Sequence, residues 1–199
     1  MREKKNPKNS YTMPSVEAVQ VELARVKYKE RYKSTFRSTI YVLIVVAAVT
    51  ILIATTFMPV FRTYGDSMTP TLSEGDIVLA LKGNNFGTGD VVGLYVGNKL
   101  LIKRVIAGPG QWIDINEDGD ISIDGKKQDE PYVTEKALGD CNIELPFQVP
   151  DGRYFVIGDH RSTSLDSRNT AVGCIADEQI VGRIFFRVWP FSEFGAVKQ

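Results

Sequence analysis

Histidine is nearly missing from this 199-residue sequence, in which His160 is the only one, and cysteine occurs just twice, at Cys141 and Cys174. A serine protease triad would have to take its base from His160, with one of several nearby aspartates as its partner. The cysteines could form a disulfide only if their Cα atoms lay within about 7 Å, and two free thiols are the preferred interpretation. Hydrolytic chemistry in this chain therefore depends on this single histidine or on a base of another kind.

Charged residues are absent from residues 38–61, where "IYVLIVVAAVTILIATTFMPV" is almost wholly aliphatic. At about 1.5 Å per residue, twenty helical residues cover the roughly 30 Å hydrocarbon core of a bilayer. A cleavable secretory signal fits poorly, because the preceding basic segment and the apolar run are too long and no small-x-small exit follows. The pattern predicts a transmembrane helix over residues 38–61.

Net charge is also absent, since 24 Lys and Arg balance 24 Asp and Glu, but the total hides two parts of opposite sign. Residues 1–37 hold ten of the basic and four of the acidic residues, which leaves fourteen basic against twenty acidic in the remainder. Basic residues gather on the cytoplasmic side of a membrane span. We therefore expect a cytoplasmic N-terminus and an extracytoplasmic domain over residues 62–199, in a protein of the cell membrane.

The basic leader, residues 1–37, contains "SVEAVQVELARVKYKERYK", in which Val16, Val19, Leu23 and Val26 share one helical stripe. Cationic residues surround this stripe. An amphipathic helix here could lie on anionic membrane lipid, or the segment could be a solvated leader. The sequence leaves both interpretations open.

Beyond Arg62 the chain consists of short apolar runs separated by Gly, Asn, Asp and Pro, such as "DIVLALK", "GDVVGLYVG" and "YFVIGD". Their length, their β-branched content and the spacing of the turns are typical of antiparallel strands. Polar residues become more frequent around residues 115–150, which indicates a small insertion. The predicted fold is mostly β: one N-terminal transmembrane helix followed by an antiparallel β domain with a small inserted β region.

One serine, Ser67 in "YGDSMTPTLSEGD", stands a few residues past the apolar run and is a candidate nucleophile. A serine hydroxyl at its own pKa is a poor nucleophile at neutral pH and needs a base. A lysine can act as that base only if burial lowers its pKa from about 10.4.

Such a lysine is available in "NKLLIKRVIAGPG". In a strand, Lys103 and Arg104 must point to opposite faces, and lysine tolerates a site that needs a neutral form far better than arginine does. Lys103 is therefore the better candidate for a base. The alternative, which stays open, is that both are charges on an edge strand whose ends reach water.

Four stretches, "GDSMTPTL", "GDIV", "IKRVIAGPG" and "GDHRSTSLDSR", follow a single membrane anchor in this order. Together they resemble the type I signal peptidases, membrane-bound Ser-Lys endopeptidases that remove signal peptides from exported preproteins. The resemblance covers roughly residues 40–190, and four ordered motifs are far more specific than one. It implies cleavage after a small-x-small motif, without a cofactor or metal.

The resemblance also implies roles for individual residues. Ser67 is similar to the nucleophile and Lys103 to the general base, while Ser164 falls where the family has a hydroxyl bonded to the lysine. Asp166 and Arg168 fall where the family has an ion pair near the site. Asp159 matches the aspartate that opens the last motif, and Met68 and Pro70 match residues that shape the nucleophile turn.

The oxyanion that forms during acyl transfer needs donors already aimed at it, and the backbone N–H of Ser67 is the expected one. Some family members have a serine two residues before the nucleophile as a second donor, whereas this chain has Gly65. The second donor is left as a backbone N–H or a water. Ile102, Tyr64 and Thr63 are candidate walls of the substrate pocket, and each has an alternative as ordinary core.

Two further patterns need an interpretation. "FMPVF" and "WPFSEF" could rest the domain on the bilayer interface or could close the core. "DINEDGDISIDG" imitates a calcium loop, but Gly125 at its twelfth position offers no carboxylate. The alternating flanks of this stretch favour a hairpin turn without a metal.

Three other classes of protein fit the sequence less well. Self-cleaving repressor-type proteases use a related Ser-Lys fold, but they are soluble and act with DNA, whereas this chain has an anchor and no basic reading helix, so no nucleic-acid partner is expected. A sortase-like transpeptidase is excluded because the cysteines and His160 lack its sequence context. A non-enzymatic β module at the cell surface would not need Ser67 or Lys103.

Overall fold

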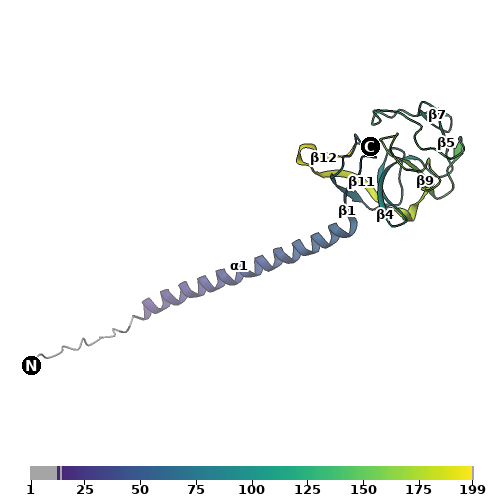
Figure 1. Ribbon diagram of the computed structural model, residues 1–199. Helices are drawn as coiled ribbons and strands as arrows, with labels where there is room; N and C mark the ends of the chain where they lie inside the picture. The colour runs from purple at the N-terminus through teal and green to yellow at the C-terminus, as the bar shows by residue number, and fades with distance from the viewer. Residues whose placement is uncertain (1–12, 14, 199) are drawn as a thin grey trace, which may run out of the picture. The chain divides into compact units, whose positions relative to one another are not determined.

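The computed structural model describes Met13 and residues 15–198, so most of the first part of the basic leader lies outside the described residues. The chain divides into two compact units, one ending at Leu52 and one beginning at Ile53. The described part consists of one long helix and twelve short strands (Figure 1). The expectation of a long apolar helix followed by antiparallel β structure is confirmed.

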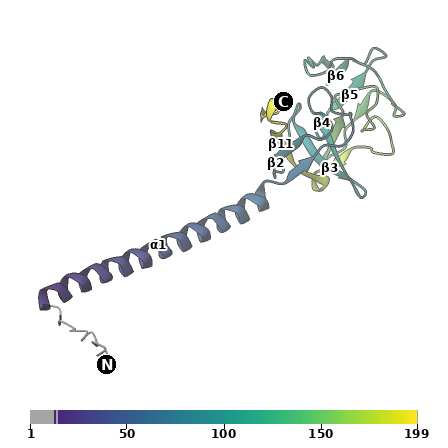
Figure 2. The same cartoon turned by 60° about the vertical axis from the view of Figure 1, so that its left-hand side comes forward.

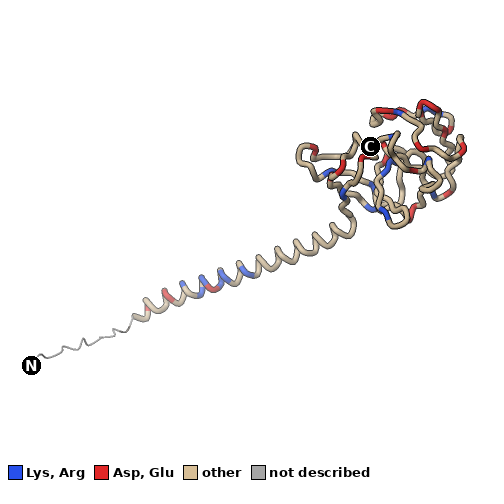
Figure 3. The backbone as a smooth tube through the Cα atoms, viewed as in Figure 1, with Lys and Arg blue, Asp and Glu red and all other residues tan. Residues whose placement is uncertain are grey.

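Helix α1 runs without a break over Val16–Phe57. The Ser15 hydroxyl accepts a hydrogen bond from the N–H of Ala18 at 3.3 Å, which satisfies one of the unpaired donors of the first turn. Charged residues lie only in the N-terminal half, and the C-terminal half is apolar (Figure 3). Among the described residues, α1 is the one helix that is long and apolar enough to cross a membrane.

The C-terminal end of α1 differs from the sequence expectation. The helix ends at Phe57, four residues before the expected boundary at residue 61, and strand β1 (Val60–Arg62) follows. Pro59 explains this, because the residue before a proline is forced away from helical backbone angles. The described part of the leader and the apolar run form one helix, so the start of the span expected at residue 38 lies inside α1.

The large sheet has eight strands in the order β1-β2-β11-β3-β4-β9-β10, with β12 paired to β11, and the small sheet has the order β7-β6-β5-β8. Every strand pair is antiparallel. The remaining large-sheet strands are β2 (Ile77–Leu81), β3 (Val91–Val96), β4 (Lys99–Ala107), β9 (Arg153–Ile157), β10 (Ile175–Ala176), β11 (Ile180–Trp189) and β12 (Gly195–Ala196). Those of the small sheet are β5 (Trp112–Ile115), β6 (Ile121–Ile123), β7 (Lys126–Lys127) and β8 (Phe147–Gln148).

The small sheet occupies the segment where the sequence predicted an insertion (Figure 2). The stretch that imitates a calcium loop forms the β5–β6 hairpin, with Gly119 in the left-handed region at φ 80°. Apolar residues of both sheets share one core cluster, in which Phe155 of β9 and Ile113 of β5 are fully buried. The small sheet therefore packs on the large one at the end of β4 and β9.

The edges of β1 and of the first part of β4 are among those in the large sheet that have no strand partner in the described part of the chain. β1 lies at the end of the strand order and pairs only with β2. β4 pairs with β3 over Lys99–Arg104, but β9 joins it only from Arg104 onward, so the other edge of residues 99–102 stays open. The space beside these two edges is where the candidate site lies.

Candidate active site

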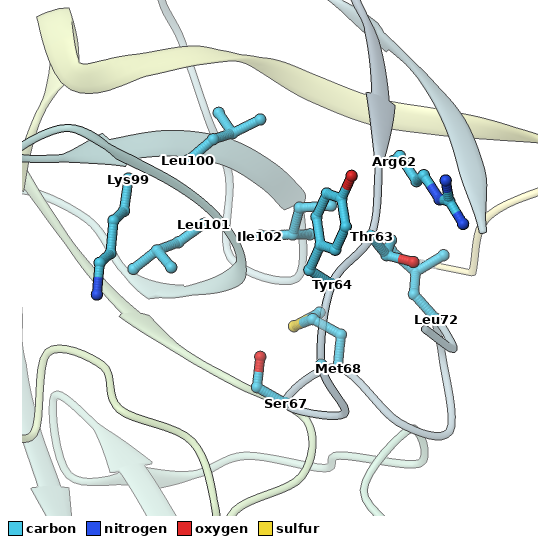
Figure 4. A pocket seen from close by; sticks show the side chains of 11 residues that line it. Arg62, Thr63, Tyr64, Ser67, Met68, Leu72, Lys99, Leu100, Leu101 and Ile102 are labelled. Atoms are coloured by element: carbon cyan, nitrogen blue, oxygen red, sulfur yellow. The ribbon is translucent and has the colours of Figure 1, made fainter. Parts of the chain in front are cut away.

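Ser67 lies in a tight turn that follows β1. The N–H of Thr69 donates to the carbonyl of Asp66 and that of Leu72 to the carbonyl of Met68, each at 2.9 Å. Met68 and Leu72 are buried in one core cluster with Phe61 of β1, and this packing fixes the position of the turn. This leaves the Ser67 hydroxyl directed into the hollow beside residues 99–102 (Figure 4).

The Lys103 amine meets two hydroxyl groups. Its Nζ lies 2.8 Å from Oγ of Ser67 and 2.9 Å from Oγ of Ser164. The Lys103 residue is only 3% exposed, and this burial lowers its pKa to about 8 from the usual 10.5. Desolvation is the largest effect; the negative charge of Asp166 raises the pKa and the positive charge of Arg168 lowers it.

A buried turn holds Ser164 in place. Its N–H donates to the carbonyl of His160 at 3.1 Å, and the N–H of His160 in turn donates to the carbonyl of Ser67 at 3.1 Å. Gly158 lies against both serines, because a β-carbon added there would overlap Oγ of Ser164 and the carbonyl oxygen of Ser67. The 158–164 segment and the Ser67 turn thus fit together only with glycine at position 158.

Asp166 and Arg168 form a bidentate ion pair in which Nε and Nη2 of Arg168 each lie 2.8 Å from a carboxylate oxygen. Both side chains are buried, and Asp166 also accepts the N–H of Gly158 at 3.1 Å. Arg168 donates to the carbonyl of Leu138 at 2.7 Å, in the segment that connects β7 and β8 of the small sheet. The pair therefore connects the turn beneath Lys103 to the small sheet.

Asp159 pairs with Arg104, on the opposite face of β4 from Lys103. Nε and Nη2 of Arg104 lie 2.8 and 2.7 Å from the two carboxylate oxygens, and the Arg104 residue is fully buried. The Thr71 hydroxyl donates to Asp159 at 2.5 Å, and the Tyr132 ring stacks on the guanidinium at 3.8 Å. The alternative that Lys103 and Arg104 are edge charges reaching water is wrong.

The structure brings in residues that the sequence interpretation missed. Besides Gly158, Thr71 and Tyr132, it joins Arg161 to Glu130 in a third buried bidentate pair, with contacts of 2.5 and 3.2 Å. Tyr132 donates to the same glutamate at 3.1 Å. All of these residues lie in loops, and Arg161 is 31 residues from Glu130, so strand alternation gives no signal for them.

A groove of about 420 Å³ opens beside Ser67 between two chain segments. Thr63, Tyr64 and Ile102, the three expected walls of the substrate pocket, all line it (Figure 4). Tyr64 is largely exposed, whereas Thr63 is buried and its hydroxyl donates to the carbonyl of Ser73. The other lining residues are Arg62, Gly65, Ser67, Met68, Leu72, Lys99, Leu100 and Leu101.

Gly65 has a backbone reason to be glycine. Its φ of 75° lies in the left-handed region, which residues with a side chain rarely adopt. The backbone N–H of Ser67 donates to no acceptor in the part of the chain that the structure describes. A free donor beside the Ser67 hydroxyl is thus present at the groove.

The remaining candidates lie outside this contact. Nδ1 of His160 lies 3.4 Å from Oδ2 of Asp66, so its ion-pair partner is Asp66 and not Ser67. Cys141 and Cys174 are free thiols, and burial raises the pKa of Cys174 to about 11, which makes it a poor nucleophile. Neither residue type offers an alternative to Lys103 as the group in contact with Ser67.

An antiparallel β domain with a serine hydroxyl bonded to a buried amine, at the wall of an open groove, has the architecture of a serine hydrolase. The family model of signal peptidase, peptidase S26, matches residues 36–189. The chain belongs to the signal peptidase family, peptidase S26, and is a serine endopeptidase.

Two relatives similar in sequence agree with this assignment. Signal peptidase I S of Bacillus subtilis is 38% identical over 165 residues, which cover 75% of this chain and 88% of the relative. Signal peptidase IB of Staphylococcus aureus is 40% identical over 151 residues, which cover 65% and 77%. A crystal structure of a signal peptidase I from Enterococcus faecalis aligns with a TM-score of 0.41 and 23% identity, over 50% of this chain and 96% of that one.

Proposed function

We propose that this chain is a membrane-anchored endopeptidase that removes signal peptides from exported preproteins, with Ser67 as nucleophile and Lys103 as general base. The observation that carries the proposal is the 2.8 Å contact between Ser67 Oγ and a lysine amine that burial leaves with a pKa of about 8. At neutral pH such an amine is uncharged in a useful fraction of molecules, as a base must be.

The proposed reaction proceeds in two steps. Neutral Lys103 takes the proton of Ser67 as Oγ attacks the scissile carbonyl carbon, and the lysine then gives this proton to the departing amine nitrogen. Water next attacks the acyl carbon while Lys103 takes its proton, the bond from this carbon to Oγ of Ser67 breaks, and the lysine returns the proton to Oγ. Ser164, 2.9 Å from Nζ, holds the amine in line with Oγ through both steps.

The oxyanion requires donors that are already in place, and the unpaired N–H of Ser67 is the first. Gly65 has no hydroxyl to offer, and its left-handed φ disfavours any residue that would carry one. The second donor in this proposal is therefore another backbone N–H or a bound water.

The two open strand edges suggest how a peptide is held. An extended segment laid along residues 99–102 can form main-chain hydrogen bonds as an added strand. Alternate side chains of that segment then face the groove walls at Ile102 and Tyr64. Walls this close to Ser67 favour small residues at the cut, in agreement with a small-x-small motif.

The location proposed for this reaction is the outer face of the membrane. Helix α1 is the candidate span, and the basic residues before it favour a cytoplasmic N-terminus. The site would then lie outside, ten residues beyond the end of the helix at Phe57. Trp189, Phe191 and Phe194 are exposed and suited to contact membrane lipid.

The proposal is tested with a peptide that carries an Ala-x-Ala exit. Ser67→Ala and Lys103→Met should each abolish cleavage, whereas His160→Ala should retain most of it. Thermal unfolding of each variant separates lost chemistry from lost fold. Cleavage that survives Lys103→Met and disappears with His160→Ala would overturn the assignment of the base.

A further inference from the structure

The first half of α1 carries an apolar stripe that nothing covers in the described part of the chain. Val16, Val19, Leu23 and Val26 are between 42% and 74% exposed. Their spacings of three, four and three residues match the a and d positions of a heptad repeat. A stripe of this period is the seam by which one helix packs on another.

The continuity of α1 argues against a membrane surface as its cover. Because the helix is unbroken from Val16 to Phe57, its first half continues along the axis of the proposed span. Val26 precedes the apolar run at residue 38 by twelve residues, or roughly 18 Å of helix. A straight helix that crosses the bilayer cannot also lay this stripe on the headgroups.

We propose that the stripe pairs with the same stripe of a second copy of this chain, as a short parallel coiled coil. Two copies with the same single span enter the membrane in the same direction, so their stripes meet in parallel and at the same height. This inference rests on the membrane span of the proposed function, and not on the chemistry of Ser67.

The shape of the helix surface fits this partner. A hollow on α1 is lined by Ala18, Val19, Glu22, Leu23 and Val26. In a parallel coiled coil, a side chain at an a position inserts into a hole formed by four residues of the facing helix. For Leu23 of the second copy, these four are the lining residues other than Ala18. Leu23 of the facing helix would therefore fill a hollow that Leu23 of this helix helps to line.

Charge complementarity agrees with parallel pairing. Glu22 falls at a g position and Lys27 at the e position five residues later, the two positions that meet across a parallel seam. Two symmetric Glu22–Lys27 pairs would therefore flank the Leu23 layer. Glu30 and Lys33, at the next a and d positions, end the apolar seam.

The same heptad phase continues into the apolar half of α1. Positions a and d there are Ile40, Ile44, Ala47, Ile51 and Ala54, all in one register with Leu23. Small residues such as Ala47 and Ala54 let helix backbones approach closely inside a bilayer. Two apolar heptads are short for a free coiled coil, but confinement of both spans to one membrane raises their effective concentration.

Cysteine cross-linking of the full chain in lipid vesicles tests the pairing. In a background of Cys141→Ser and Cys174→Ala, single cysteines at Leu23 and Val26 should cross-link about tenfold more than cysteines at Val21 and Tyr28, which face away from the seam. Equal cross-linking at all four positions would overturn the proposal. So would cross-links in cells to another protein, with none between purified copies.

Charge reversal gives a second and independent readout. Glu22→Lys and Lys27→Glu should each reduce cross-linking through a cysteine at Leu23 by about tenfold, and the double reversal should restore it. A double variant no better than the single ones would contradict the parallel register. Peptide cleavage and alkaline extraction of the same vesicles report the proposed activity and the proposed span separately.

Discussion

Gly158 lies directly against Ser164, with no room for a side chain at position 158. An added β-carbon would overlap the Ser164 hydroxyl and the Ser67 carbonyl oxygen together. These two groups belong to the two segments that meet at the Lys103 amine, so the backbone of Gly158 sets the distance between them.

Gly158→Ala should lower kcat by about a hundredfold, because the β-carbon must push Ser164 or the Ser67 turn out of line. Peptide cleavage and thermal unfolding measure the two effects of the substitution. Gly83→Ala is the matched control, since an added carbon at Gly83 meets nothing within 4 Å. Full activity of Gly158→Ala would show that the contact does not set the geometry.

The pH dependence should report Lys103. With its pKa lowered to about 8, the amine gains protons as the pH falls through 8, and kcat/KM should drop tenfold per pH unit below that. Because the unfolded chain holds this proton up to about pH 10.4, the lysine favours folding increasingly as the pH rises from 8 to 10. His160→Ala should keep the midpoint, and a midpoint near 6.5 that this variant abolishes would refute the assignment.

Ser164→Ala should lower kcat by about tenfold to a hundredfold and leave KM nearly unchanged, because Lys103 loses one of its two hydroxyl contacts. Steady-state cleavage at saturating and low peptide separates the two constants. Ser167→Ala is the control: its hydroxyl is equally buried, but it bonds the carbonyl of Gly173 and the N–H of Val156. That variant should lose stability rather than kcat.

Glu130→Gln should destabilise the fold by about 3–5 kcal/mol, because it leaves the buried Arg161 guanidinium without its counterion. Urea unfolding gives the change, and Glu130→Leu with Arg161→Met should recover part of it. Asp120→Asn removes a half-buried carboxylate that contacts two cations, Lys127 and Lys136. Glu130→Gln should lower the free energy of unfolding clearly more than Asp120→Asn does. Equal losses would argue against a structural role of the buried pair.

Trp189→Ser with Phe191→Ser should slow cleavage of a preprotein inserted in vesicles by about tenfold, through loss of apolar contact with lipid. Cleavage of a soluble peptide should change little. Trp112→Ser is the matched control, because Trp112 and Trp189 are both 48% exposed and Trp112 belongs to the small sheet. Equal loss on both substrates would indicate that these aromatics support the fold.

The sequence predicted those parts of the site that depend on local pattern. Strand alternation alone assigned Lys103 and Arg104 to opposite faces of β4, and the ordered motifs pointed to Ser67, Ser164 and Asp166. What alternation could not predict is that both faces of β4 are covered at this point. Burial of Arg104 comes from Tyr132, which lies 28 residues further along the chain.

The end of the helix shows a similar limit. An uncharged run to Phe61 extends the predicted span, because hydropathy does not distinguish a membrane helix from the apolar strand that follows it. Phe61 is instead a β1 residue, and its ring lies against Gly93 of β3, where any side chain would collide with it. The boundary between the membrane helix and strand β1 within this apolar stretch therefore depends on tertiary packing.

The open edges of β1 and of residues 99–102 carry a hazard as well as a use. Unpaired edges invite permanent pairing with a neighbouring sheet, the first step of aggregation, and proteins commonly guard them with charged side chains. Arg62 and Lys99 stand one on each side of the groove. Both are cationic, so two molecules that approached groove to groove would repel each other, while a short neutral peptide could still enter and leave.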